Sequence, residues 1–156
     1  MKTAQLSKRG FTLIELLVVI GILAVLLAIT LIAINPAKQF AQANNTKRRS
    51  DVNAILNAID QYAADHKGAL PQGVPTSALP IQKTGGNNTD ADICSDLVTK
   101  YLAALPVDPL TNGGAAITDC SQNYSTDYDV VQSQSDNRVT VTAPRAELNE
   151  VITVTR

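Results

Sequence analysis

The chain has 156 residues, enough for one small domain with an additional segment. Its formal net charge is −1, but three of its 13 basic side chains and none of its 14 acidic ones lie in the first ten residues, so the remainder is mildly acidic. An acidic body with few aromatic residues lacks the basic face that nucleic-acid binding needs, so nucleic acid is not indicated as a partner.

An apolar run occupies residues 11–34, interrupted by Thr12, Glu15, Gly21 and Thr30. As a helix it would be about 36 Å long, enough to cross a hydrocarbon core of about 30 Å. It is longer than the apolar region of a secretory signal peptide, which has about 7 to 15 residues. The run therefore predicts a membrane-spanning helix.

Two proteins of another class remain as alternatives. A secreted protein would begin at Asn44, after the small residues of Ala41-Gln42-Ala43, and a simple membrane-anchored protein would keep the uncut chain. Neither explains Glu15, because an acid inside an apolar span costs free energy and usually has a function.

The residues around this acid resemble the cleavage and methylation motif of type IV prepilins and type II secretion pseudopilins. At residues 8–20 the chain reads KRGFTLIELLVVI, with Gly10 before Phe11 and Glu15 five positions after the glycine. The resemblance implies cleavage between Gly10 and Phe11 by a prepilin peptidase, followed by N-methylation of Phe11. It divides the N-terminus into a leader, residues 1–10, and a transmembrane and assembly helix, residues 11–35.

The same resemblance implies where the chain works and with what. The precursor would be a single-pass protein in the cytoplasmic (inner) membrane, in contact with lipid, with its head outside the cytoplasm. An inner-membrane assembly machinery would then build it into an extracellular or periplasmic helical filament of identical subunits. Basic residues flank both ends of the apolar run, so their count does not set the orientation.

Glu15 has two interpretations after cleavage. It could neutralise its own chain's N-terminus and complement the helix dipole, which is worth roughly 0.3 to 1 kcal/mol. In the second interpretation it pairs with the Phe11 amine of a neighbouring subunit and penalises wrong axial registers, because an unpaired buried charge is costly. The resemblance to pilins favours the second.

Pro36 ends the apolar run and predicts a helix kink, or simply marks the exit from the membrane. An amphipathic helix half is expected over residues 36–67, ending before Gly68. Its apolar stripe comprises Val52, Ile55, Leu56, Ile59, Tyr62 and Ala63. The basic triplet at residues 47–49 is interpreted as a solvated helix face, or else as a site for pairing with acidic heads of other subunits.

Residues 69–92 contain several prolines and glycines and predict a long loop, followed by a short helix over residues 95–105. The next segment, Leu105-Pro106-Val107-Asp108-Pro109, resembles the Leu-Pro-x-Asp-Pro segment of major type II secretion pseudopilins. Those commonly continue with tryptophan, where this chain has Leu110. Pilus and pseudopilus subunits therefore remain alternatives, with the type IV pilin preferred.

Two cysteines, Cys94 and Cys120, are too few for a tetrahedral metal site. A disulfide between them is favoured over two free buried thiols, and it requires an oxidising compartment. A cysteine pair is also typical of pilins, which supports the preference for a pilin.

Residues 124–131, 138–143 and 151–155 alternate as β-strands and predict a small antiparallel sheet. With the N-terminal helix packed on it, this sheet gives an α+β, pilin-like fold whose globular head occupies residues 68–156.

No catalytic or cofactor site is expected. The single histidine, His66, lies at a helix end, where contact with the terminal carbonyls is its expected role, and no nucleophile–base or phosphate-binding motif occurs. Related pseudopilins can hold calcium in the loop equivalent to Asp127, Asp129 and Asp136, but the spacing here matches no calcium loop. These acids are therefore interpreted as solubilising turn carboxylates, and calcium binding stays open as the alternative.

Overall fold

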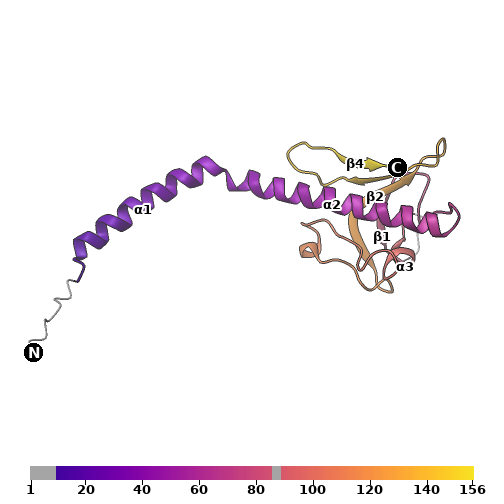
Figure 1. Cartoon of the computed structure of the whole chain (residues 1–156), viewed down its shortest axis with the longest axis horizontal. Helices are drawn as coiled ribbons and strands as arrows, with labels where there is room; N and C mark the ends of the chain where they lie inside the picture. Colours follow the sequence, from indigo (N-terminus) through magenta and orange to yellow (C-terminus); the bar gives the residue numbers. More distant parts are fainter. Residues whose placement is uncertain (1–9, 86–88) are drawn as a thin grey trace, which may run out of the picture. The chain divides into compact units, whose positions relative to one another are not determined.

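The computed structural model describes residues 10–85 and 89–156. By its internal contacts the chain divides into two units, Met1–Gln39 and Phe40–Arg156. The first consists of helix α1 and the first turn of helix α2, and the second contains the rest of α2, a short helix α3 and a four-stranded sheet (Figure 1).

Helix α1, Leu13–Ile34, consists of leucine, isoleucine, valine and alanine with few exceptions, and none of its residues is buried within the chain. It begins at Thr12, whose hydroxyl accepts a hydrogen bond from the Glu15 amide while the Glu15 carboxylate accepts one from the Thr12 amide. This reciprocal pair is a capping box, which satisfies amides that the first helical turn leaves free. In the part of the chain that the structure describes, α1 is the one helix long and apolar enough to cross a membrane.

Asn35 interrupts the helical geometry between α1 and the next helix, α2, which comprises Pro36–Asp65. Asn35 adopts a left-handed conformation, with φ 47° and ψ 77°, and its side-chain oxygen accepts a hydrogen bond from the Lys38 amide. Asparagine tolerates this conformation, and proline is well suited to the first position of a new helix because its missing N–H would have no partner there. The break therefore lies directly before Pro36.

The C-terminal end of α2 follows from Gly68. Its φ is 91°, a left-handed conformation that costs glycine little, and its amide donates to the Ala63 carbonyl at 2.7 Å. The expected helix end near this glycine is confirmed, with the last helical residue at Asp65.

The sheet is antiparallel throughout, in the order β1-β2-β3-β4. Its strands are β1 Leu79–Lys83, β2 Tyr124–Gln132, β3 Val139–Ala143 and β4 Ile152–Thr155. The last three lie where the alternating pattern predicted them, and the α+β class is confirmed. The interpretation of residues 69–92 as loop throughout was wrong, because β1 lies among them. Pro80 argued against a strand in the sequence, but β1 is an edge strand, where a proline is tolerated.

The core of the second unit lies between α2 and the sheet. The predicted stripe of α2 supplies Val52, Ile55, Leu56 and Ile59, all fully buried, and the sheet supplies Ile81, Tyr128, Val130 and Val141 among others. Burying each of these large side chains contributes roughly 1.5–3 kcal/mol relative to exposure. The predicted packing of this helix half on the sheet is confirmed.

Helix α3, Cys94–Leu97, is shorter than the helix expected over residues 95–105. Helical geometry ends at Val98, which is extended with φ −71° and ψ 142°, and the next residue, Thr99, has φ 74°. An isolated bridge pairs Val98 with Leu102. Leu97 and Leu105 are nevertheless buried, so the apolar spacing reflected burial and not a continuous helix. Cys94, the first residue of α3, is joined to Cys120 by a disulfide with a Cα–Cα distance of 5.5 Å.

Candidate functional site

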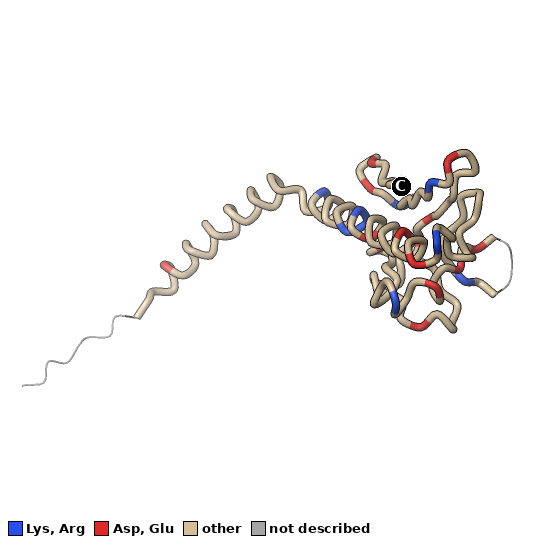
Figure 2. The backbone as a smooth tube through the Cα atoms, turned by 45° about the vertical axis from the view of Figure 1, so that its right-hand side comes forward, with Lys and Arg blue, Asp and Glu red and all other residues tan. Residues whose placement is uncertain are grey.

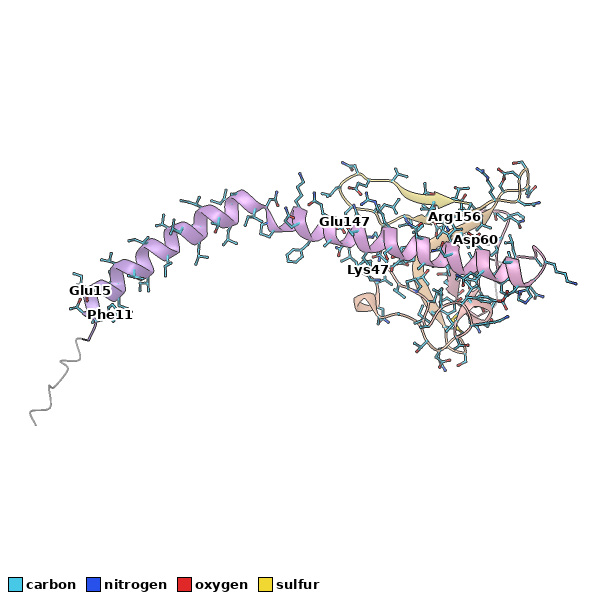
Figure 3. The ribbon with its side chains drawn as sticks, viewed as in Figure 1. Phe11, Glu15, Lys47, Asp60, Glu147 and Arg156 are labelled. Atoms are coloured by element: carbon cyan, nitrogen blue, oxygen red, sulfur yellow. A yellow bond between two sulfur atoms is a disulfide. The ribbon has the colours of Figure 1, made fainter. Side chains whose placement is uncertain are left out.

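The predicted cleavage bond, between Gly10 and Phe11, lies in exposed chain before α1 begins (Figure 3). The Phe11 side chain is 91% exposed, and a side chain added at Gly10 would meet no atom within 4 Å. A peptidase can therefore reach the backbone on both sides of this bond. The rest of the leader, with Lys8 and Arg9, lies outside the described residues, and cleavage and methylation stay predictions.

Glu15 is the one charged residue of α1 (Figure 2). One oxygen of its carboxylate accepts bonds from the Thr12 amide and the Thr12 hydroxyl, both at 2.7 Å. In the uncut chain the acid is thus bonded within its own helical turn, as a cap. Cleavage would place a positive amine at Phe11, one turn away, and whether Glu15 then pairs within or between subunits stays a prediction.

The apolar surface of α1 is exposed among the residues that the structure describes. Every large apolar side chain from Leu13 to Ile34 is at least half exposed, and Gly21 leaves a shallow apolar depression lined by Leu17, Val18, Ile22, Val25 and Leu26. Small residues of this kind allow close approach of helices in membranes. Such a surface has to be covered by lipid or by helices of other copies.

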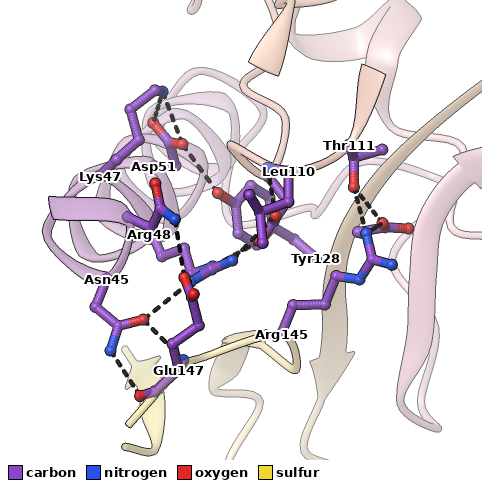
Figure 4. Close-up of polar contacts among 12 residues, drawn as sticks. Asn45, Lys47, Arg48, Asp51, Leu110, Thr111, Tyr128, Arg145 and Glu147 are labelled. Carbon is purple, nitrogen blue, oxygen red and sulfur yellow. Dashed lines mark hydrogen bonds and ion pairs between the residues drawn. The ribbon is translucent and has the colours of Figure 1, made fainter. Parts of the chain in front are cut away.

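The basic triplet of α2 is a solvated face only in part: Lys47 and Arg49 are exposed, as that interpretation expected, but for Arg48 it was wrong. Arg48 is fully buried, and its guanidinium donates to both oxygens of Asp108, at 2.7 and 3.2 Å. It also donates to Glu147 at 2.7 Å and to the Asn45 side chain at 3.0 Å (Figure 4). Only its neighbours Lys47 and Arg49 reach solvent, each paired with an acid of the same chain.

This Arg48 network, made of Asn45, Arg48, Asp108 and Glu147, joins three segments. Asp108 comes from the Leu-Pro-x-Asp-Pro segment, where its carboxylate also accepts from the Leu110 amide at 2.9 Å. Glu147 comes from the β3–β4 loop, whose backbone exchanges two hydrogen bonds with the Asn45 side chain, at 2.8 and 2.9 Å. The network therefore fastens both loops to α2.

The charges of the network stabilise one another. Burial lowers the pKa of Arg48, but the bonds to Asp108 and Glu147 outweigh it and hold that pKa above its usual value. Bonds from Arg48 and Asn44 lower the pKa of Glu147. Among the described residues, no buried side-chain nitrogen or oxygen lacks a hydrogen-bond partner. Arg48 thus stays ionised and fully paired inside the fold.

Sequence reasoning missed this network, although a signal for it was present. Arg48 lies four residues before Val52 and seven before Ile55, so it extends the apolar stripe of α2 by one turn. A charged residue in such a stripe is rarely buried without a partner. Asp108, an acid between two prolines in an apolar segment, was the matching partner.

The three acids considered for calcium do not form a site. Asp127 is held by Arg145 at 2.7 Å and by the Thr111 hydroxyl, and Asp136 bonds within its own turn. Burial and the neighbouring Asp127 raise the pKa of Asp129. Within residues 10–85 and 89–156, no three acidic, histidine or cysteine side chains come together as metal ligands. The residues present do not fit a calcium ion.

His66 lies just after the end of α2. One ring nitrogen is 2.8 Å from the Tyr62 carbonyl, and the ring stacks on Tyr62 at 3.9 Å between centroids. This contact with a terminal carbonyl is the role expected for His66.

Comparisons with known proteins cover about two thirds of the chain. Residues 6–31 match the model of the prokaryotic N-terminal methylation motif. The chain is 34% identical to the type II secretion system core protein G of Pseudomonas aeruginosa over 68% of its length and 70% of the relative's. It is 32% identical to the protein of the same name from Escherichia coli, over 68% and 69%. No solved structure gave a significant match.

The aligned regions cover more than two thirds of each relative, and the matched motif contains Gly10, Phe11 and Glu15. The fold agrees with this match, since a long apolar helix precedes a small antiparallel sheet packed on a second helix. The chain therefore belongs to the family of prepilin-type filament subunits that also contains the type II secretion system core protein G.

Proposed function

We propose that this chain is the structural subunit of a type IV pilus, a helical filament of identical copies held together by α1. The observation that carries this proposal is the apolar surface of α1, which is exposed over its whole length and carries a single acid, Glu15, next to the predicted new N-terminus. Lipid covers this surface in the precursor, and the α1 helices of other copies cover it in the filament.

Processing would change the partner of Glu15. In the uncut chain Thr12 satisfies the carboxylate, and cleavage by a prepilin peptidase at Gly10–Phe11 adds a cationic amine nearby. Within the filament interior, where little water remains, that amine and the carboxylate of the adjacent copy attract strongly, because opposite charges interact more strongly at low dielectric. Subunits one step out of register would bury both charges unpaired, so the pair selects the axial register.

The proposed topology places the head outside the cytoplasm. The Cys94–Cys120 disulfide supports it, since disulfides persist in oxidising compartments. An inner-membrane assembly machinery would extract the helix from the bilayer and add the subunit to the filament. The proposed role requires neither catalysis nor a cofactor.

A type II secretion pseudopilus is the second candidate. The names of the two relatives favour it, and so does the resemblance of residues 105–109 to the Leu-Pro-x-Asp-Pro segment of major pseudopilins. The disulfide and Leu110, which stands where those proteins commonly have tryptophan, favour the pilus.

The test combines chemistry and imaging. Filaments sheared from cells are imaged with an antibody against this subunit, and mass spectrometry determines the N-terminus of the subunit in them. We expect long surface filaments whose subunits begin at methylated Phe11, and no such subunits in cells that lack the prepilin peptidase.

Other results would count against parts of the proposal. A mature N-terminus at Asn44 or an uncut chain would exclude filament assembly by this route. A chain that begins at methylated Phe11 but forms no surface filaments, in cells whose protein secretion depends on it, would replace the pilus by the pseudopilus.

A further inference from the structure

Strand β2 has a bulge at Asp127, which lies on the partly exposed face of the strand. Pro80 of β1 pairs with Asp129 and Gln82 pairs with Ser125, so a single β1 residue lies opposite the three residues between those partners. Asp127, the middle one, has φ 57°. Such bulges redirect side chains, and aspartate is one of the few residues that adopts a left-handed conformation at moderate cost.

Three segments of the head meet at this carboxylate (Figure 4). Arg145 lies in the β3–β4 loop. One nitrogen of its guanidinium donates hydrogen bonds to the Asp127 carboxylate at 2.7 Å and to the Thr111 hydroxyl at 2.8 Å. The Thr111 hydroxyl donates to the same carboxylate oxygen, and Ser125 donates to the other at 3.1 Å. We call Thr111, Asp127 and Arg145 the Arg145 clasp.

The Arg145 clasp lies beside two acids of β2, Asp127 and Asp129, that could otherwise attract a cation. Asp127 and Asp129 are two acids on one strand, and burial together with Asp127 raises the pKa of Asp129, as for two carboxylates near each other. Calcium binds to such groups through six to eight oxygen ligands. Here both oxygens of Asp127 already receive donors from the protein, and the positive charge beside it belongs to Arg145.

We propose that Arg145 is a built-in replacement for a bound calcium ion, which fastens the Thr111 loop and the β3–β4 loop to the bulge of β2. The positive charge belongs to the chain itself, so the two loops stay attached to β2 at any external calcium concentration. The loop after Pro109 is also held from its other side, because the Thr111 amide donates to the Asp108 carbonyl and Asp108 pairs with Arg48.

The test uses the purified full-length protein in detergent micelles. All four tyrosines, Tyr62, Tyr101, Tyr124 and Tyr128, lie in the second unit, so near-ultraviolet circular dichroism follows unfolding of this unit. Melting is measured in a calcium chelator and in calcium chloride at about 1 mM, the range in which weak extracellular calcium modules bind.

We expect the wild-type melting temperature to be the same in both solutions, and calorimetric titration to detect no calcium binding. R145Q should melt about 1–5 °C lower than wild type, the size of effect that a partly exposed ion pair has in a small domain. R145K, which keeps the charge but cannot donate in the same fork, should lie between the two. The control R138Q removes an exposed arginine that pairs only with the neighbouring turn residue Asp136, and should melt like wild type.

Two results would overturn the proposal. Calcium that raises the melting temperature of the wild type and is titrated by it would show that the ion, and not Arg145, closes this end of the head. An R145Q melting temperature equal to that of R138Q would show that Arg145 fastens nothing.

Discussion

Helix α1 and the second unit, residues 40–156, use charged residues in opposite ways. In α1 the apolar side chains face outward, and the single acid, Glu15, is bonded within its own turn. In the second unit the apolar side chains face inward, and Arg48 is buried among acids from two distant loops. The second unit therefore pairs its buried charges within the chain, whereas the apolar surface of α1 needs other molecules to cover it.

Two substitutions separate the charge of Glu15 from its capping role. E15Q should reduce filament yield on the order of tenfold or more, because the amine of the adjacent copy would be buried without its carboxylate. T12A removes the capping hydroxyl but keeps the acid, and should leave assembly close to normal. Quantitative immunoblots of sheared filaments measure both. Equal yields from E15Q and T12A would mean that Glu15 acts only as a cap.

In the second unit, removing the buried cation of Arg48 should have the largest effect on stability. R48A leaves Asp108 and Glu147 without their partner and should lower the free energy of unfolding by about 3–5 kcal/mol. R49A, the adjacent and exposed control paired with Glu150, should cost about 0–1 kcal/mol. Denaturant titration of the full-length protein measures the difference. Similar values for the two variants would contradict the role given to the Arg48 network.

The disulfide should matter less than Arg48 but more than a surface contact. It links residues 26 positions apart, and a cross-link over a loop of that size stabilises by about 3 kcal/mol. The double variant C94A/C120A should therefore unfold at lower denaturant concentration. Its filament yield should fall only in proportion to the fraction of subunits whose head is unfolded. A stability equal to that of the wild type would show that the cross-link adds nothing.

The smallest expected effect is a pH dependence from Glu147. Hydrogen bonds from Arg48 and Asn44 lower the pKa of Glu147 in the folded state below the ordinary value of 4.5. The folded state therefore favours the ionised carboxylate, and the ionised carboxylate stabilises the fold. Its contribution is complete above about pH 4.5 and is lost as the pH falls through the lowered pKa. The stability difference between wild type and E147Q should thus shrink below pH 4.5. E150Q is the matched control in the same loop, and an unchanged difference down to pH 3 would refute this linkage.

The periodicity of apolar residues was enough to predict those elements whose structure depends on neighbours in sequence. The apolar run predicted α1, the stripe from Val52 to Ile59 predicted the buried face of α2, and alternation predicted three strands. These features follow from spacing alone, because a helix or a strand repeats its faces at fixed intervals.

The family motif, the α+β class and the helix with its single acid could be predicted from the sequence. Three features became visible only in the folded chain: Arg48 is buried, Pro80 belongs to an edge strand and Arg145 holds Asp127. Each of these joins segments between about 18 and 99 positions apart, and the period of a helix or strand carries no information about which distant segments meet. From the local sequence alone, a charged side chain is expected to be exposed to solvent. Its burial becomes favourable only once the fold brings its partners within hydrogen-bonding distance.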